Sequence, residues 1–404
     1  MKMNNKIMYP IFFFCMVCLF PGCKKSNSST MTVVPFITIE RVTNAEGNSG
    51  TTAFNFTVKL NKPTTGSVSV SFSVTAGMAK EGTDYNLPSA LFIPFNAGEI
   101  QKSITVNVIG DDTKEADEDF TVTLTNPSGA TILSGTARGI ITNDDTKVPF
   151  TTVGFSTPAA YPGMILTWAD EFSGTALNTN NWSYDIGDGC PSICGWGNNE
   201  LQYYTNSPDN VFVQDGCLII ESKKQTIGGK EYSSGRIKTD GKQSFKFGRI
   251  DIRAISPSGR GIWPALWMMP QNNVYGTWPN SGEIDLMEVK GHDMKTAYQT
   301  VHYGPGPPST FTSKTFTLTK GNFNDSFYVY SMIWTIDTMR LLINNVEVNK
   351  VTAADLAGRI YPFNEKFFFI LCTAVGGNFP GAPDATSTYP QWLIVDYVRV
   401  FQQI

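Results

Sequence analysis

Histidine and charged residues are both scarce in this 404-residue sequence. The only histidines are His292 and His302, so a histidine-rich metal centre is not expected. Charged residues make up 16% of the chain, against about a quarter in typical soluble proteins. With 31 lysines and arginines and a net charge of −4, the chain is not expected to bind nucleic acid. Threonine, serine, asparagine, glycine and aromatic residues are plentiful instead, which is typical of an exported β-protein.

Long helical and apolar stretches are missing as well. No stretch keeps helical periodicity for four turns, and only Thr352–Ala357 is expected to form a short turn of helix. The apolar run Ile7–Phe20 has 14 residues, too few to span a bilayer comfortably. Because Lys2 and Lys6 precede it, we interpret residues 1–22 as a signal peptide and predict export.

The end of the apolar run, Leu19-Phe20-Pro21-Gly22-Cys23, resembles a bacterial lipobox. The resemblance implies lipidation of Cys23 and a lipoprotein anchored to the membrane at the cell envelope or cell surface. Phe20 and Pro21 depart from the usual pattern, so cleavage nearby and free secretion is the alternative. Residues 23–34 are predicted to form a flexible tether.

Four cysteines remain beyond this segment: Cys190, Cys194, Cys217 and Cys372. An exported protein can form disulfides. Cys190 and Cys194 are four residues apart in a loop rich in glycine and proline, and they are the favoured pair.

Residues 35–146 alternate apolar and polar side chains in short runs such as Ala53–Val58, Ser67–Phe72 and Ser103–Val108. This period of two predicts half-buried antiparallel strands, and the regular spacing of the runs predicts a β-sandwich. All eight tryptophans lie outside the segment. A sugar-binding surface usually carries aromatic rings, so a spacer is favoured over a carbohydrate-binding module.

Acidic residues gather in this segment, with 13 aspartates and glutamates against 7 lysines and arginines. Clustered carboxylates suit Ca²⁺, which takes six to eight oxygen ligands; a solvated acidic loop is the alternative. The runs Gly82–Tyr85, Ile109–Phe120 and Ile141–Asp145 resemble a Calx-beta domain. The resemblance implies an immunoglobulin-like sandwich that holds structural Ca²⁺. The ligand candidates that it implies are Glu40, Asp84, Asp111, Asp112, Glu115, Asp144 and Asp145.

Residues 147–162 show little pattern and are predicted to be a linker. Residues 163–404 are again rich in strand patterns, with expected strands at 244–254, 327–336, 340–346, 366–372 and 392–402. A domain of this size built from strands predicts a large sandwich, and such a sheet can curve to leave a groove on its concave face. The expected fold is therefore all-β, an immunoglobulin-like sandwich followed by a β-jelly roll with a concave substrate cleft.

Three carboxylates, Glu283, Asp285 and Glu288, lie within six residues of one expected strand. Alternation places Glu283 and Asp285 on one face and turns Glu288 away. One extra residue, a bulge at Leu286 or Met287, would return Glu288 to the same face. Like charges on one face repel and stabilise nothing, whereas paired carboxylates are what glycoside hydrolysis requires.

Aromatic residues surround this acidic strand in Gly195–Tyr204, Gly261–Trp267 and Trp278-Pro279. The flat face of a tryptophan matches the apolar face of a pyranose ring, while polar side chains bind its hydroxyl groups. Together with the three acids, these runs indicate a sugar-binding groove.

The second domain resembles glycoside hydrolase family 16, and within it the laminarinases. The resemblance runs in order through Ser234–Thr239, Phe247–Ile250, Gly261–Pro270, Gly282–Glu288, Val301–Gly304, Ala374–Asn378 and Val395–Val400. It implies endo-acting, retaining hydrolysis of β-1,3-glucan, with Glu283 as nucleophile, Glu288 as general acid/base and Asp285 steering Glu283. The substrate-binding residues that we predict are Asn198, Glu200, Arg236, Trp263, Trp267 and His302.

The resemblance also implies a structural Ca²⁺ held by Asp396 and by the backbone carbonyls of Glu171 and Gly216, with no metal needed for catalysis. Cys372-Thr373 departs from the family, which usually carries asparagine before the Ala374–Gly377 run. The alternatives that stay open are a mixed-linkage glucanase or a galactan hydrolase of the same fold, and a non-catalytic glucan-binding surface protein. The protein is expected to be a monomer.

Overall fold

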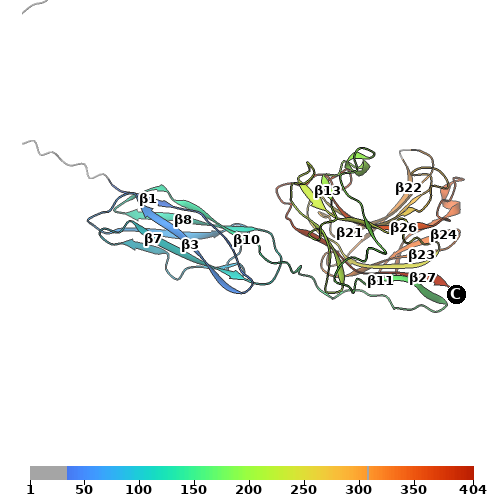
Figure 1. Ribbon diagram of the computed structural model, residues 1–404, viewed down its shortest axis with the longest axis horizontal. Coiled ribbons are helices and arrows are strands. Elements are labelled where there is room, and N and C mark those ends of the chain that lie inside the picture. The colour runs from blue at the N-terminus through green and yellow to red at the C-terminus, as the bar shows by residue number, and fades with distance from the viewer. Residues whose placement is uncertain (1–33, 307–308) are drawn as a thin grey trace, which may run out of the picture.

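The computed structural model describes residues 34–306 and 309–404. The predicted signal peptide, the predicted lipidation residue Cys23 and nearly all of the tether lie outside the described residues. Figure 1 shows two β-domains arranged one after the other along the long axis, joined by a single stretch of chain. Among the described residues, no helix is both long and apolar enough to cross a membrane.

The first domain packs two five-stranded sheets face to face. One sheet has the order β5 (Tyr85–Asn86), β7 (Gln101–Gly110), β3 (Gly50–Leu60), β1 (Phe36–Ile39), β9 (Thr131–Ser134). The other has the order β2 (Val42–Ala45), β10 (Thr136–Thr142), β8 (Glu118–Ser128), β4 (Val68–Ala76), β6 (Phe92–Phe95). Their inward-facing residues form a core around Phe54, Phe56 and Phe120, all fully buried. The predicted sandwich is confirmed.

The second domain packs a seven-stranded sheet on an eight-stranded sheet. The seven-stranded sheet has the order β12 (Ser183–Tyr184), β17 (Arg236–Lys238), β26 (Phe367–Val375), β19 (Ile262–Pro270), β20 (Glu283–Val289), β21 (Thr296–Tyr303), β22 (Thr310–Thr317). The outer sheet has the order β14 (Val211–Gln214), β15 (Cys217–Ser222), β27 (Gln391–Gln403), β18 (Gly248–Ile255), β23 (Tyr328–Trp334), β24 (Thr338–Ile343), β25 (Val346–Thr352), with β11 (Met164–Asp170) also paired to β27.

Small elements complete this domain. β13 (Gln202–Tyr204) pairs in parallel with β16 (Tyr232–Ser234), and η1 (Cys194–Gly197) and η2 (Ala353–Leu356) are single 3₁₀ turns. The second of them is the short helical turn that the sequence predicts. The core between the two sheets includes the fully buried Trp182 and the nearly fully buried Trp334.

Two expected strands differ from the prediction. The run Arg340–Val346 is not one strand, because Asn344 and Asn345 adopt positive φ angles of 50° and 64° and form the hairpin turn between β24 and β25. Paired asparagines tolerate this left-handed conformation. The run that begins at Ser244 starts its strand only at Gly248, after Phe247 with φ of 63°.

Candidate active site

The seven-stranded sheet of the second domain lines a cleft of about 870 Å³. Successive side chains of a strand point to opposite faces, so each strand contributes alternate residues to the cleft. For example, β19 contributes Trp263, Ala265, Trp267 and Met269, while Leu266 and Met268 between them lie in the core between the sheets. The period of two thus builds both a core and a binding surface from the same strands.

β20 breaks this alternation once, and the break brings the three acids together. Asp285 pairs with Thr300 of β21, whereas Glu288 pairs with Tyr298, so three steps on β20 face two on its neighbour. On the other side, Trp267 faces Asp285 and Leu266 faces Met287. The extra residue is therefore Leu286, which is a β-bulge as predicted. Glu283, Asp285 and Glu288 consequently all line the cleft.

Glu283 lies opposite His302 across the β20–β21 ladder. Its Oε2 accepts a hydrogen bond from the indole Nε1–H of Trp278 at 2.6 Å, and its Oε1 lies 3.9 Å from His302 Nε2. Burial raises the pKa of Glu283 and the charge of Asp285 adds to this, while His302 and the Trp278 indole act in the opposite direction. Two neighbours thus favour the ionised form of Glu283.

Glu288 and Asp285 have different surroundings. Glu288 Oε1 accepts a hydrogen bond from Trp263 Nε1–H at 3.1 Å, and burial together with the charges of Asp285 and Glu283 raises its pKa. Asp285 is 3% exposed, and burial raises its pKa. Its Oδ2 has no hydrogen-bond partner among the described residues and lies 3.5 Å from His302 Nε2. Burial thus favours a bound proton within this cluster, which is what general acid catalysis requires, while Trp278 and His302 favour the ionised form of Glu283.

The predicted sugar-binding residues on the β17 side of the cleft already form a network. Glu200 is 6% exposed and accepts hydrogen bonds from Gln202 at 2.7 Å and from Asn198 and Tyr204 at 3.3 Å. Arg236 pairs with Asp185 at 2.9 Å. Asn198, Glu200 and Arg236 all line the cleft, so the structure brings the three together at one wall.

Tryptophans hold the Arg236 guanidinium from two directions. Its central carbon lies 4.3 Å from the ring centre of Trp196 and 4.9 Å from that of Trp267, which are cation–π distances. Trp267 is thus a support for Arg236 as well as a face of the cleft. Its Nε1 is buried without a hydrogen-bond partner among the described residues.

The backbone at Gly376 allows this wall to form. Gly376 has φ of 70°, and a Cβ atom there would lie 2.6 Å from the side chain of Leu201. Only glycine combines this conformation with such a close approach. The loop that carries Asn198 and Glu200 can therefore pack directly on the end of β26.

Several cleft residues were not among those predicted from the sequence. They include Asp185, Trp196, Trp278, Phe311 and Phe379. Trp196 and Trp278 stood in the aromatic runs that indicated the groove, and their proximity to other aromatics was the available signal. Asp185, Phe311 and Phe379 are isolated in the sequence, and no local pattern marks them.

The cysteines behave as two classes. Cys190 and Cys194 form a disulfide, as predicted, in the loop that ends at η1. Cys217 and Cys372 are free and buried. Cys372 lies opposite Arg236 on β17 and Ala265 on β19, and burial raises the pKa of its thiol to about 11. The departure from the family at this position therefore gives the cleft floor a small, neutral side chain.

The predicted calcium ligands of the second domain lie on its outer side, and their carboxylates already have cationic partners. Asp396 Oδ2 accepts a hydrogen bond from Arg253 Nη1 at 2.6 Å, and Glu171 pairs with Arg399 through both carboxylate oxygens at 2.7 and 2.8 Å. Asp396 is the only one of the predicted ligands that would bind through its carboxylate, and the guanidinium of Arg253 already compensates that charge. The calcium site predicted from Asp396 and the backbone carbonyls of Glu171 and Gly216 would therefore share the Asp396 carboxylate with Arg253.

The predicted ligands of the first domain fit better, although not as one set. Two trios each place a carboxylate oxygen of every member within 4.8 Å of the others: Glu46, Asp144, Asp145 and Asp84, Glu115, Glu118. Asp145 is 5% exposed, and its Oδ2 has no partner among the described residues. An oxygen of this kind suits a hard cation.

Membership of these trios differs from the prediction. Glu46 and Glu118 belong to them and were not predicted, while Asp111 contributes to the repulsion at Glu46. Glu40 instead pairs with Lys59 at 2.6 Å and Asp112 with Lys147 at 3.0 Å, so neither is in a trio.

Comparison with known protein families supports both domains. Residues 198–389 match the family model for glycosyl hydrolases family 16, and residues 34–145 match that for the Calx-beta domain. The two matched segments correspond to the two β-domains in Figure 1.

Individual relatives resemble the second domain. The chain is 41% identical to a glucan endo-1,3-beta-glucosidase A1 of Niallia circulans over 62% of this chain and 40% of that protein. It is 37% identical to a beta-glucanase of Rhodothermus marinus over 60% of this chain and 87% of that protein. The crystal structure of the laminarinase catalytic domain from Thermotoga maritima superposes with a TM-score of 0.56 at 39% identity, covering 60% of this chain and 99% of that domain. The chain thus spans less than half of the first of these relatives.

Proposed function

Because this chain belongs to the glycosyl hydrolases family 16, we propose that it hydrolyses β-1,3-glucan as an endo-acting, retaining enzyme. The observation that carries the proposal is the bulge in β20, which turns Glu283, Asp285 and Glu288 to one cleft. A regular strand of the same sequence, without the bulge, would turn Glu288 away from the cleft.

The surroundings of the carboxylates support a division of roles. Glu283 receives the Trp278 N–H and faces His302, both of which favour its ionised form, so it serves as nucleophile at the anomeric carbon. Glu288 donates its proton to the departing glycosidic oxygen. A water molecule, deprotonated by Glu288, then attacks the glycosyl–enzyme ester, which releases the sugar and restores both groups.

Asp285 stands between these two groups and acts on Glu283. When protonated, Asp285 can donate to the ionised Glu283, which removes one negative charge from the cluster. His302 is close enough to both carboxylates to stabilise the arrangement electrostatically. Aromatic faces of Trp263, Trp278 and Trp267 offer stacking surfaces, while Asn198, Glu200 and Arg236 supply polar atoms for hydroxyl groups.

The substrate assignment is tested by digestion of laminarin, lichenan, agarose and carrageenan side by side. We expect release of oligosaccharides from laminarin. Faster cleavage of lichenan would instead identify a mixed-linkage enzyme, and cleavage of agarose or carrageenan alone would identify a galactan hydrolase. No turnover of any of the four, with retained glucan binding, would identify a binding protein.

The roles of the acids are tested separately. Glu283→Ala should abolish hydrolysis and leave oligosaccharide binding intact, and substantial remaining turnover would reject Glu283 as nucleophile. Proton NMR of the first product should show the β-anomer. An initial α-anomer would show inversion and exclude the covalent intermediate. A time course of product sizes would reveal transfer of the glycosyl group to a second sugar in place of water.

Export and anchoring remain predictions from the sequence. Radiolabelled fatty acid should enter the wild-type protein in bacterial cells and not a Cys23→Ser variant, whereas equal labelling would reject lipidation at Cys23. We further propose structural calcium at the acidic trios of the first domain, to be measured by titration calorimetry. Sedimentation analysis should give a monomer.

A further inference from the structure

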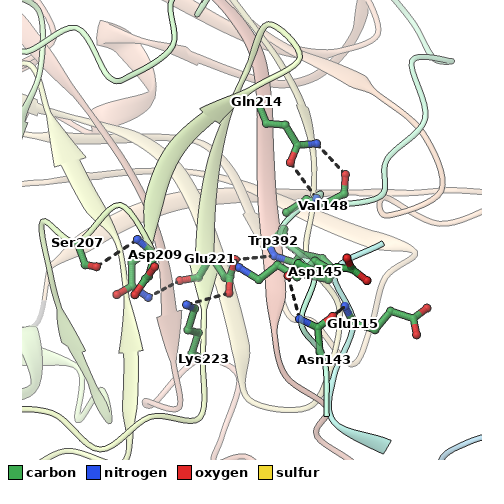
Figure 2. Close-up of polar contacts among 12 residues, drawn as sticks. Glu115, Asn143, Asp145, Val148, Ser207, Asp209, Gln214, Glu221, Lys223 and Trp392 are labelled. Atoms are coloured by element: carbon green, nitrogen blue, oxygen red, sulfur yellow. Dashed lines mark hydrogen bonds and ion pairs between the residues drawn. The ribbon is translucent and has the colours of Figure 1, made fainter. Parts of the chain in front are cut away.

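The two domains touch through a buried ion pair. Lys114 Nζ of the first domain lies 2.7 Å from Oε2 of Glu221 on β15 of the second domain. The Glu221 side chain is fully buried, and the Lys114 side chain is 16% exposed. Figure 2 shows two further partners of the Glu221 carboxylate, a hydrogen bond from Trp392 Nε1 at 3.0 Å and an ion pair with Lys223 at 3.4 Å. Burial of a charged carboxylate is costly unless partners of this kind compensate its charge.

The chain that follows the first domain is bound to the second domain, although its sequence predicts a linker. Val148 exchanges two backbone hydrogen bonds with the Gln214 side chain at 2.8 and 2.9 Å, as Figure 2 shows, and is 1% exposed. Further on, Phe155 N–H donates to Phe327 O at 2.9 Å. The segment therefore lies along the outer sheet as part of its packing.

The acidic trios lie directly beside these contacts. Lys114 N–H donates to Lys147 O at 2.8 Å, which joins the acidic loop to the start of the bound segment. The Asn143 side chain accepts from Glu115 N–H at 2.8 Å and donates to Asp145 O at 2.9 Å (Figure 2). One side chain thus connects a residue of each trio, and Lys114 precedes Glu115 in the chain.

Repulsion acts on this region when no cation compensates it. Glu46, Asp144 and Asp145 each bring a carboxylate oxygen within 4.8 Å of the others, and Asp145 Oδ2 has no hydrogen-bond partner among the described residues. The same carboxylates flank the loop that carries Lys114. A divalent cation would bring these groups together and fix the loop.

We propose that a divalent cation held by Glu46, Asp144 and Asp145 locks the first domain onto the second, because it fixes the loop from which Lys114 reaches the buried carboxylate of Glu221. The first domain then acts as a cation-dependent rigid extension of the catalytic domain and not as a loose spacer. This inference rests on the calcium binding proposed above for the first domain.

Trypsin cleavage after Lys147 measures the locked state in the full chain. The Lys147 side chain is 58% exposed, but the following residue, Val148, is buried on the second domain, so the bond is protected while the contact holds. We expect cleavage of the wild-type protein to be at least about tenfold slower in calcium than in EDTA, since cleavage follows the population of the open form. Calorimetry on the same samples reports calcium binding independently.

Two matched variants decide the role of Lys114. Lys114→Ala should bind calcium as the wild type does, yet be cleaved rapidly in calcium and in EDTA alike. Lys59→Ala, which removes the exposed pair with Glu40 on the same domain, should behave as the wild type. Protection of Lys114→Ala by calcium would overturn the proposal. So would equal cleavage of the wild type with and without bound calcium, whereas absence of calcium binding would overturn the calcium assignment as well.

Discussion

Replacement of Trp278 by phenylalanine tests how the cleft keeps its nucleophile ionised. The indole Nε1–H donates to Glu283 Oε2 at 2.6 Å. A hydrogen bond to a charged group contributes about 1.5–3 kcal/mol, and one pKa unit corresponds to about 1.4 kcal/mol. Because the bond favours the ionised carboxylate, its loss should raise the pKa of Glu283 by about one to two units.

The assay is the pH dependence of kcat/KM on a β-1,3-gluco-oligosaccharide. The nucleophile must be ionised, so the acidic limb of the profile should move to higher pH by the same one to two units, with a loss of about tenfold to hundredfold on that limb. Phe311→Leu is the matched control, since Phe311 is an exposed aromatic residue of the same cleft and has no hydrogen-bond donor to offer Glu283. If Trp278→Phe raises KM while the acidic limb stays in place, Trp278 is only a stacking surface and the reasoning is refuted.

Three further predictions address other parts of the molecule. Trp263→Phe removes the donor to Glu288 and should raise its pKa, so the basic limb of the same profile should move to higher pH; an unchanged limb would contradict Glu288 as the acid. Serine at both Cys190 and Cys194 should lower the free energy of unfolding by no more than about 2 kcal/mol in a urea titration, because the bridge closes a short loop. Phe120→Ala, in the core of the first domain, should lower the free energy of unfolding by about 3–5 kcal/mol, measured by calorimetry, and leave kcat on short oligosaccharides unchanged.

Local patterns in the sequence were sufficient to predict the three acids at the centre of the cleft. The alternation of β20 and the spacing of its three acids predicted the bulge, because both depend only on backbone geometry over seven residues. The Cys190–Cys194 pair was predictable for the same reason. Such features are decided by neighbours in the sequence.

Contacts between distant segments were not predictable in this way. Glu46 joins Asp144 and Asp145 from another part of the chain, so it was missed, while Glu40 looked equally suitable and lies with Lys59. The sequence did not show that the predicted linker is bound to the second domain near Val148, because the partner of Val148, Gln214, is 66 positions away. No periodicity in the segment itself reports a partner at that distance.

Concentration of the three acids should also destabilise the fold as the pH rises. Burial raises the pKa of Asp285, Glu283 and Glu288 above the values of the unfolded chain, where they titrate near pH 4. Above that pH the folded state therefore holds more protons than the unfolded state. As the pH rises towards the folded pKa of each group, that group lowers the free energy of unfolding.

Asp285→Asn removes one of these buried charges, and its Oδ2 has no partner to lose among the described residues. It should raise the free energy of unfolding at pH 8 by at least about 1.4 kcal/mol, the equivalent of one pKa unit, and change it little at pH 4, because burial holds the pKa of Asp285 well above its value in the unfolded chain. Thermal unfolding at pH 4 to 8 measures the difference, with the exposed Asp209→Asn as control. Activity should fall in the same variant. Equal stability of Asp285→Asn and the wild type at pH 8 would show that the cluster is not strained by its charge.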